Sequence, residues 1–449
     1  MAKKQLTMEE KLQAALVPVE EQPYKVPENW CWTRLGNVAM WGSGGTPSRK
    51  NPSFYQGDIP WIKTGELNEG VIYDTEEHIS KEAVEKSSAK MFPVNTVIIA
   101  MYGATIGKVG IMGVPATTNQ ACACGVCSKG IEVTFLAKFL QSQKQNFIMK
   151  GKGGAQPNIS QQIIKNHPIA LPPMAEQSRI VARIESLFAK LDEAKEKIQE
   201  VLDGADLRRA AILHQAFTGK LTEKWRKENN VSFDSWEEKK LGDIGVLERG
   251  RSKHRPRNDP KLFGGSYPFI QTGDIAAAGM FITSHKQTLS DIGFQQSKLF
   301  PAGTLCITIA ANIGDVSILS YDCCFPDSVV GFTPYEGIAL SEYVYYLMTV
   351  IQQELEANAP ATAQKNINLK VLNEVLITIP SIAEQQEIVR LLDSLLSREQ
   401  STATACEEAL TTIDTLKKSI LARAFRGELG TGDPADPDAK ELLREILSA

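Results

Sequence analysis

The sequence predicts an α+β protein with two mixed α/β domains separated by two long antiparallel coiled-coil helices, as a pseudo-two-fold internal repeat. Three observations predict this fold class. The second half of the chain echoes the first at a shift of about 208 positions. Each half contains a Gly-rich stretch with short apolar runs, and a long helical pattern with apolar residues at coiled-coil spacing follows each stretch.

The repeat consists of short matched segments that occur in the same order in both halves. The pairs include 60–67 (PWIKTGEL) with 268–275 (PFIQTGDI), 155–159 (AQPNI) with 363–367 (AQKNI), 175–177 (AEQ) with 383–385 (AEQ), and 216–219 (AFTG) with 424–427 (AFRG). A period this long indicates a duplicated module, consisting of a domain and its connector. The match is strong in the connectors and weak inside the domains, as expected for one scaffold that carries two different binding surfaces.

Each Gly-rich stretch reads as a mixed α/β domain. In the first, residues 94–100 and 109–112 are expected to be strands and residues 132–149 a helix. In the second, residues 303–309 form the matching strand and residues 340–355 the matching helix.

The connectors read as long helices with a coiled-coil seam. Ile180, Ile184, Leu187 and Leu191 alternate spacings of four and three, and the second copy begins the same way before Glu399 and Thr402 weaken its seam. At 1.5 Å per residue, about 40 residues span about 60 Å. The second apolar stripe needs a partner, so we expect the two helices to pair antiparallel. Packing in the core of a helix bundle is sufficient to explain the apolar stripes.

Composition limits the function classes. The net charge of −4 excludes global basicity, so any DNA contact must come from local patches. The eight cysteines form no framework typical of a short secreted protein, which favours reduced thiols. No apolar stretch reaches membrane-spanning length, and the N-terminus lacks the apolar core of a signal peptide. We therefore expect a cytoplasmic protein.

These motifs together resemble the specificity subunits of type I restriction–modification systems. The resemblance covers about residues 30–429 and is carried by 57–65 (GDIPWIKTG), the two AQxNI segments, 171–173 (LPP) followed by Glu176 and Gln177, and AFxG at both helix ends. It implies two target-recognition domains that each read half of a bipartite DNA site. It also implies a complex with two methyltransferase subunits and with restriction/translocase subunits. S-adenosylmethionine, ATP and Mg²⁺ are then expected on the partner subunits, and none on this chain.

The resemblance divides the chain into seven parts. They are an N-terminal extension (1–29), recognition domain 1 (30–173), spacer helix 1 (174–220), a linker (221–235), recognition domain 2 (236–380), spacer helix 2 (381–428) and a C-terminal tail (429–449). The role of residues 1–29 is not implied, although residues 8–16 suit a short docking helix.

The clearest candidate DNA contact is the basic loop 249–261, which has six Lys or Arg residues against one Asp. Such a loop can follow phosphates, and its arginines can read guanine. The alternative is a solvated charged loop that contacts no DNA. The candidate DNA-contact residues of the loop 249–261 are Arg249, Arg251, Lys253, His254, Arg255 and Arg257.

Domain 1 has an equivalent loop with fewer basic residues, 43–50, where small residues permit close backbone approach to DNA. Its candidates are Thr46, Ser48, Arg49 and Lys50. A third loop, 151–156, contributes Lys152. At a matched strand end, Lys63 is a candidate for phosphate and Gln271 for adenine, next to Thr64 and Thr272; a plain turn role for Thr-Gly is equally open.

No catalytic or metal motif is complete. The segment 51–54 (NPSF) lacks the second proline of an adenine methyltransferase motif, and 103–108 (GATIGK) lacks the spacing of a phosphate-binding loop. Cys122, Cys124 and Cys127 have no matching ligand cluster, so structural cysteines in a buried strand are expected. A non-catalytic DNA-reading subunit is therefore predicted. The alternatives are a fused enzyme and a coiled-coil scaffold that reads no DNA.

Overall fold

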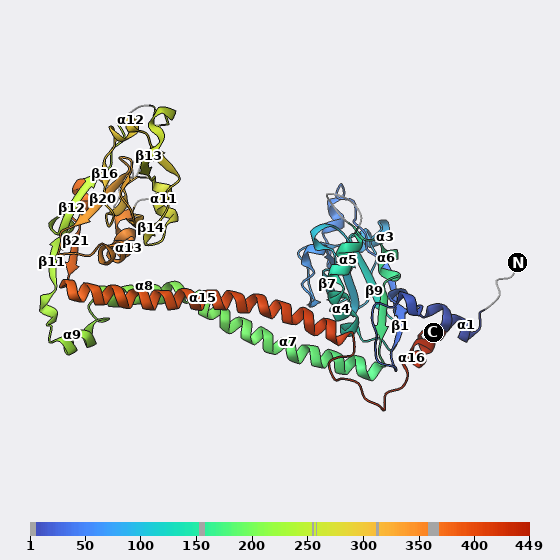
Figure 1. Ribbon diagram of the computed structural model, residues 1–449. Coiled ribbons are helices and arrows are strands. Elements are labelled where there is room, and N and C mark those ends of the chain that lie inside the picture. Colours follow the sequence, from blue (N-terminus) through green and yellow to red (C-terminus); the bar gives the residue numbers. More distant parts are fainter. Residues whose placement is uncertain (1–5, 152–157, 254–255, 257, 311–313, 358–367) are drawn as a thin grey trace. The chain divides into compact units, whose positions relative to one another are not determined.

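The computed structural model describes residues 6–151, 158–253, 256, 258–310, 314–357 and 368–449 (Figure 1). It divides into two compact units: unit 1, Met1–Ile198 with Glu408–Ala449, and unit 2, Gln199–Glu407. Each unit holds one mixed α/β domain and part of the long helices, which confirms the predicted fold class. No helix in the described part of the chain is long and apolar enough to cross a membrane.

Unit 1 contains the first mixed domain. Its strands are β1 (Cys31–Arg34), β2 (Ala39–Ser43), β3 (Ile59–Ile62), β4 (Val71–Ile72), β5 (His78–Ile79), β6 (Thr96–Ala100), β7 (Val109–Met112), β8 (Thr117–Thr118), β9 (Cys122–Cys127) and β10 (Pro168–Leu171). Its helices are α1 (Met8–Ala15), α2 (Leu35–Val38), α3 (Lys81–Lys86), α4 (Val133–Ser142), α5 (Lys144–Lys150), α6 (Gln161–Lys165), α7 (Met174–Asp203) and α16 (Ala439–Ser448). Within the described residues the sheet orders are β2-β9-β6-β7-β4, β5-β3-β8 and β1-β10.

Unit 2 builds the same scaffold again. Its strands are β11 (Glu237–Lys240), β12 (Gly245–Arg249), β13 (Phe263–Phe269), β14 (Phe281–Ile282), β15 (Gln287–Leu289), β16 (Leu299–Phe300), β17 (Leu305–Thr308), β18 (Val316–Leu319), β19 (Cys323–Cys324), β20 (Val329–Pro334) and β21 (Leu376–Ile379). Its helices are α8 (Ala205–Phe217), α9 (Glu223–Asn229), α10 (Leu241–Ile244), α11 (Thr272–Ala277), α12 (Asp291–Phe294), α13 (Ser341–Ala357) and α14 (Leu369–Asn373), and α15 (Ile382–Ala424) starts here. The described sheet orders are β12-β20-β17-β18-β14, β15-β13-β19-β16 and β11-β21.

The main sheets hold the apolar cores. The predicted strands correspond to β6, β7 and β17, whose residues lie in buried clusters because they face covering helices. Helix α4 packs on β6 and β7, and α13 packs on β17 and β18 (Figure 1). The helix expected at 132–149 is two helices, since Gln143 ends α4 and precedes α5. The buried strand expected to hold Cys122, Cys124 and Cys127 is β9, and the shorter β8 precedes it.

The long helices pair antiparallel within each unit. In unit 1, Asp192 of α7 contacts Lys417 of α15, and Lys195 lies 3.9 Å from Asp414. In unit 2, the Arg208 guanidinium of α8 lies 2.8 Å from the Glu399 carboxylate of α15. The glutamate that weakens the apolar seam in the sequence is therefore matched by an arginine on the facing helix.

Spacer helix 1 differs from the single helix expected. It is interrupted at Gly204, between α7 and α8, whereas α15 is continuous over 43 residues. Glycine has the lowest helix propensity after proline, which explains why the interruption falls there. Hydrogen bonds continue past it, because Gly204 N–H donates to the Glu200 carbonyl at 3.1 Å.

The duplicated AEQ segment ties each long helix to its domain. The Gln177 side chain accepts from the Glu132 N–H and donates to the Gly130 and Pro172 carbonyls. Gln385 repeats this with Leu340, Ile338 and Pro380. Each glutamine satisfies buried backbone groups that otherwise lose hydrogen bonds on folding, which explains why both halves carry it.

Each glutamate of the AEQ segments accepts a hydrogen bond from a threonine of the other repeat. In unit 1, Glu176 accepts from Trp30 Nε1 at 2.8 Å and from Thr431 Oγ1 at 3.1 Å. In unit 2, Glu384 accepts from Thr222 Oγ1 at 2.7 Å and from the Arg226 guanidinium at 2.6 Å. The segments after AFTG and AFRG therefore act as structural anchors.

Three segments outside the recognition domains and the spacer helices contribute helices to the two units. The N-terminal α1 and the C-terminal α16 pack together and place Leu12 and Leu443 in the core of unit 1. Both helices are short and amphipathic, and pairing their apolar faces removes both from water. The linker 221–235 contains α9, which carries the buried Arg226.

All eight cysteines are free thiols, and six of them are buried. In β9, burial raises the pKa of Cys124 to about 12. A thiol with such a pKa is not reactive near neutral pH.

Candidate nucleic-acid interface

In domain 1, one glutamate brings two predicted DNA-contact residues together. Arg49 follows the loop after β2 and pairs with the Glu77 carboxylate at 2.6 Å. Lys63, at the end of β3, lies 3.0 Å from Glu77 and 3.1 Å from Glu76. The Arg49 guanidinium also lies over the Tyr55 ring, 4.0 Å from its centroid.

Glu77 remains charged in this cluster. Hydrogen bonds from Arg49, and secondarily from Lys63, lower its pKa to about 2, against an opposing effect of burial. The carboxylate therefore neutralises and orients both cations over the accessible pH range, and a DNA phosphate must compete with it. Sequence reasoning missed Glu77, because an acidic residue 28 positions from Arg49 in the chain gives no local signal.

The remaining domain 1 candidates differ in their surroundings. The Thr46 hydroxyl contacts the Gln120 side chain, and Ser48 Oγ accepts from the Lys50 N–H at 3.4 Å. Lys50 is exposed and has no ion-pair partner among the described residues. Lys152 lies outside the described residues. Of the predicted cations with described positions in domain 1, Lys50 is thus the one most available to a phosphate.

The glycines of the loop 43–50 approach the protein's own backbone. A Cβ at Gly44 would overlap the Thr118 carbonyl, and one at Gly45 would overlap Ser88. Gly45 N–H donates to Thr118 O at 2.9 Å. The close approach expected for DNA is therefore used to hold this loop against β8 and the segment after α3.

We expect Gly45→Ala to destabilise the protein by about 1–3 kcal/mol, because Ser88 backbone atoms must move to admit the methyl group. Gly65→Ala is the matched control, since no heavy atom lies within 4 Å of its added Cβ. Denaturant unfolding monitored by tryptophan fluorescence measures both. Equal stability of the two variants would contradict the steric role assigned to Gly45.

The strand-end Thr-Gly turns serve a structural role in both domains. Lys63 N–H donates to Glu66 Oε2 at 2.7 Å, and Gln271 N–H donates to Asp274 Oδ2 at 2.9 Å. Thr64 and Thr272 begin the helical turns that follow. The turn role is therefore present in both copies. It uses the backbone N–H of Lys63 and Gln271, so other contacts determine where their side chains lie. Gln271 Nε2 donates to Gln287 Oε1 at 2.7 Å.

In domain 2, the start of the basic loop is anchored to the segment before β20. The Arg249 side chain donates to the Asp327 carbonyl, and Arg251 N–H donates to the Phe325 carbonyl at 3.2 Å. The Arg251 and Lys253 residues are exposed. His254, Arg255 and Arg257 lie outside the described residues.

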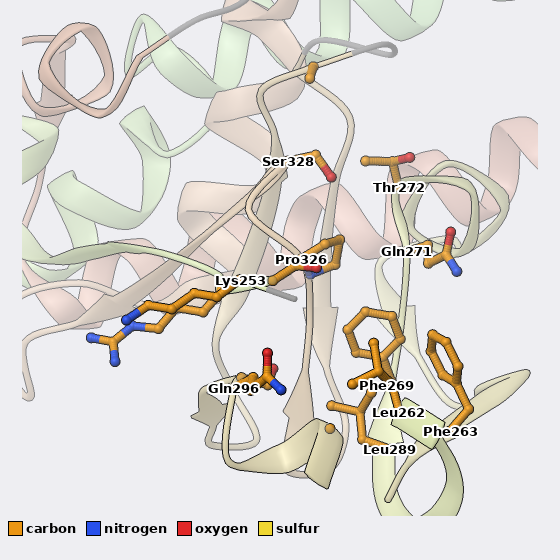
Figure 2. Close-up of a pocket in the computed structure, with 15 residues that line it drawn as sticks. Lys253, Leu262, Phe263, Phe269, Gln271, Thr272, Leu289, Gln296, Pro326 and Ser328 are labelled. Carbon is orange, nitrogen blue, oxygen red and sulfur yellow. The ribbon is translucent and has the colours of Figure 1, made fainter. Parts of the chain in front are cut away.

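Four predicted residues of domain 2 line one pocket of about 310 Å³ (Figure 2). Arg251 and Lys253 come from the basic loop, and Gln271 and Thr272 from the end of β13. Figure 2 shows Phe263, Phe269, Leu262 and Leu289 gathered on one side of this pocket. The structure thus brings together candidates that the sequence placed in separate loops, over an aromatic floor that sequence reasoning did not identify.

The family model for the type I restriction modification DNA specificity domain matches residues 27–203 and again residues 234–410. The chain is 26% identical to the type I restriction enzyme EcoKI specificity subunit of Escherichia coli (strain K12), over 90% of each protein. It is 28% identical over 255 residues to the MjaIX specificity subunit of Methanocaldococcus jannaschii, which covers 55% of this chain and 58% of the relative.

Solved structures share the fold. The crystal structure of the HsdS subunit from Thermoanaerobacter tengcongensis aligns with a TM-score of 0.67 at 21% identity, covering 91% of this chain and all of that one. A second structure, from a study of assembly and conformational transition in the type I R-M system, aligns with the same TM-score at 22% identity, over 90% of this chain. Because the family model matches both halves and most of the chain, this protein belongs to the type I restriction–modification specificity subunits and carries their DNA specificity domain twice.

Proposed function

We propose that this chain gives a type I restriction–modification complex its DNA sequence specificity, with domain 1 and domain 2 each reading one half of a split site. The observation that carries the proposal is one scaffold built twice with different side chains at matched positions, such as Lys63 in domain 1 and Gln271 in domain 2. Domain 1 presents Arg49 held by Glu77 over aromatic rings. Domain 2 presents Arg251, Lys253 and Gln271 around an aromatic-floored pocket.

The proposal assigns the chemistry to partner subunits. Two methyltransferase subunits modify adenine with S-adenosylmethionine, and restriction/translocase subunits use ATP and Mg²⁺. This chain supplies the DNA contacts and needs none of these cofactors itself. The duplication supports two methyltransferase subunits, because two copies of one scaffold can each take one copy of the same partner.

The test is a methylome by long-read sequencing. Cells that express this chain with its cognate methyltransferase subunit are compared with cells that lack only this chain. The proposal expects a split adenine-methylation motif that disappears without the chain. Complex formation without any motif would overturn sequence reading and favour a scaffold.

Glu77→Gln is expected to raise non-specific DNA affinity and weaken reading by domain 1. Loss of the Glu77 charge leaves Lys63 with the exposed Glu76 as its remaining ion-pair partner, so Lys63 competes better for phosphate and the log–log salt slope steepens by up to about 1. The same change leaves Arg49 without its main anchor, so discrimination in that half-site falls. Fluorescence anisotropy with target and scrambled duplexes across a salt series measures both effects.

Glu76→Gln is the matched control, because Glu76 is 78% exposed and contacts Lys63 alone of the two cations. An equal loss of discrimination in both variants would argue against Glu77 as the orienting residue. The folded-state pKa of Glu77 is about 2, below the ordinary value of 4.5 for a glutamate. Its contribution to stability is therefore present above pH 4.5 and is lost as the pH falls through about 2.

A further inference from the structure

The pocket in domain 2 combines an apolar floor with polar and cationic side chains. Its floor is apolar and aromatic, from Phe263, Phe269, Leu262 and Leu289. Its walls carry amides and hydroxyls, from Gln271, Thr272, Gln296, Ser297 and Ser328, and two cationic side chains stand at its margin. Its volume of about 310 Å³ lies at the small end of the range for ligand sites, about 300–1,000 Å³.

The aromatic corner of this pocket has a counterpart in domain 1. At the constant shift, Phe263 and Phe269 correspond to Tyr55 and Trp61, and each pair forms an edge-to-face contact, with centroids 6.1 Å and 5.7 Å apart. The backbone beside the two aromatic pairs also matches. Ser290 N–H donates to the Leu262 carbonyl and Ser80 N–H donates to the Phe54 carbonyl, both at 2.9 Å. The two corners are therefore the same structural feature.

Domain 1 shows what this corner accommodates. The planar Arg49 guanidinium lies 4.0 Å from the Tyr55 centroid and 5.3 Å from that of Trp61. A planar group with hydrogen-bonding edges therefore fits against the rings. At the same shift, Arg49 corresponds to Arg257, which lies outside the described residues. The side chains that line the domain 2 pocket are other residues.

We propose that the domain 2 pocket binds one base of the target DNA that has left the base stack. The inference rests on the proposed function and deepens it. The phenylalanine rings offer a stacking surface to a planar heterocycle, and Gln271 and Gln296 offer donors and acceptors to its edges. Arg251 and Lys253, which also line the pocket, offer positive charge to the phosphates that flank an extruded nucleotide.

The chemistry of the walls favours a base over other occupants. A purely apolar ligand would cover polar atoms of these walls without replacing the hydrogen bonds to water that they lose, which costs free energy. A base that remains paired in the duplex presents only its groove edge and leaves the aromatic floor uncovered. Unstacking costs a few kcal/mol, and stacking on aromatic side chains returns a comparable amount.

The experiment uses the full chain with its methyltransferase subunits on a duplex carrying the target found by the methylome. Each purine of the half-site that domain 2 reads is replaced in turn by 2-aminopurine, whose fluorescence rises on unstacking. Thymines are probed with permanganate and cytosines with hydroxylamine, which attack unstacked bases. We expect one position in this half-site, other than the methylated adenine, to show a several-fold rise.

Pocket variants assign that signal to the pocket. Gln271→Ala and Gln296→Ala are expected to reduce it several-fold, and Ser328→Trp to remove it by filling the pocket. Gln295→Ala is the matched control, because Gln295 is the exposed neighbour of Gln296 and does not line the pocket. The methylated adenine, which methyltransferases extrude for themselves, is an internal control whose signal all variants retain.

The outcomes separate the two claims. Sequence-specific binding with no second unstacked base would overturn the pocket assignment and leave the proposed function intact. A second unstacked base whose signal survives Gln271→Ala, Gln296→Ala and Ser328→Trp would also overturn it. Absence of sequence-specific binding by the wild-type complex would remove the proposed function, and the pocket assignment with it.

Discussion

Replacing Glu384 with alanine is expected to destabilise unit 2 by roughly 3–5 kcal/mol, because it leaves a buried guanidinium without its partner. The Glu384 side chain is fully buried, and the Arg226 side chain is 9% exposed. Their closest atoms lie 2.6 Å apart, and Thr222 also donates to the carboxylate. The substitution therefore removes an ion pair and a hydrogen bond at the point where α15 meets the segment after α8.

The matched variant is Glu176→Ala in unit 1. Glu176 occupies the same place in its repeat, but its donors are the neutral Trp30 indole and Thr431 hydroxyl. Leaving these groups without an acceptor costs about 1–3 kcal/mol. Denaturant unfolding of the full chain, with Glu384→Gln as the isosteric intermediate, measures the difference. Equal losses at the two sites would contradict the role given to Arg226.

Removing Arg251 and Lys253 together is expected to weaken DNA binding about 10- to 100-fold near physiological salt, on target and scrambled duplexes alike. Both residues are exposed and line the pocket edge where phosphate would lie. Loss of two phosphate contacts lowers the log–log salt slope by about 2. Folding stability is expected to remain unchanged.

The control for this double variant is Lys224→Ala with Lys227→Ala, which removes the same charge from α9 in the same unit. These lysines are 88% and 74% exposed and pair with Glu228 and Glu223. Anisotropy titrations over a salt series compare the two double variants. Similar slopes in both would show that net charge, and not the basic loop, governs DNA binding.

The sequence predicted the parts of this molecule that depend on local pattern. The repeat emerged from matched segments, β6 and β17 from apolar runs, and α15 from its seam. The paired AEQ segments were recognisable, although their hydrogen bonds to distant carbonyls were not. Gly204 carried a local signal for the break in spacer helix 1, since glycine is the least helical residue after proline.

Features built from distant residues gave no such signal. Glu77 orients Arg49 and Lys63 only because β3 and β5 pair, which places Ile59 opposite Ile79. The pocket is lined by side chains spread over the sequence from Arg251 to Ser328, so the sequence alone could not predict its aromatic floor. The docking of α1 on α16 likewise joins the two ends of the chain, whose separate amphipathic patterns did not identify each other.

The most direct test of the central claim, that each domain reads its own half-site, is the methylome of a chimera. In the chimera, residues 237–379, from β11 to β21, are replaced by the matching segment of a specificity subunit whose split target is known. If each domain reads its own half-site, one half of the methylation motif changes to the donor's half and the other half stays as in the parent. A motif in which both halves change, or neither does while the chimera folds and assembles, would contradict it.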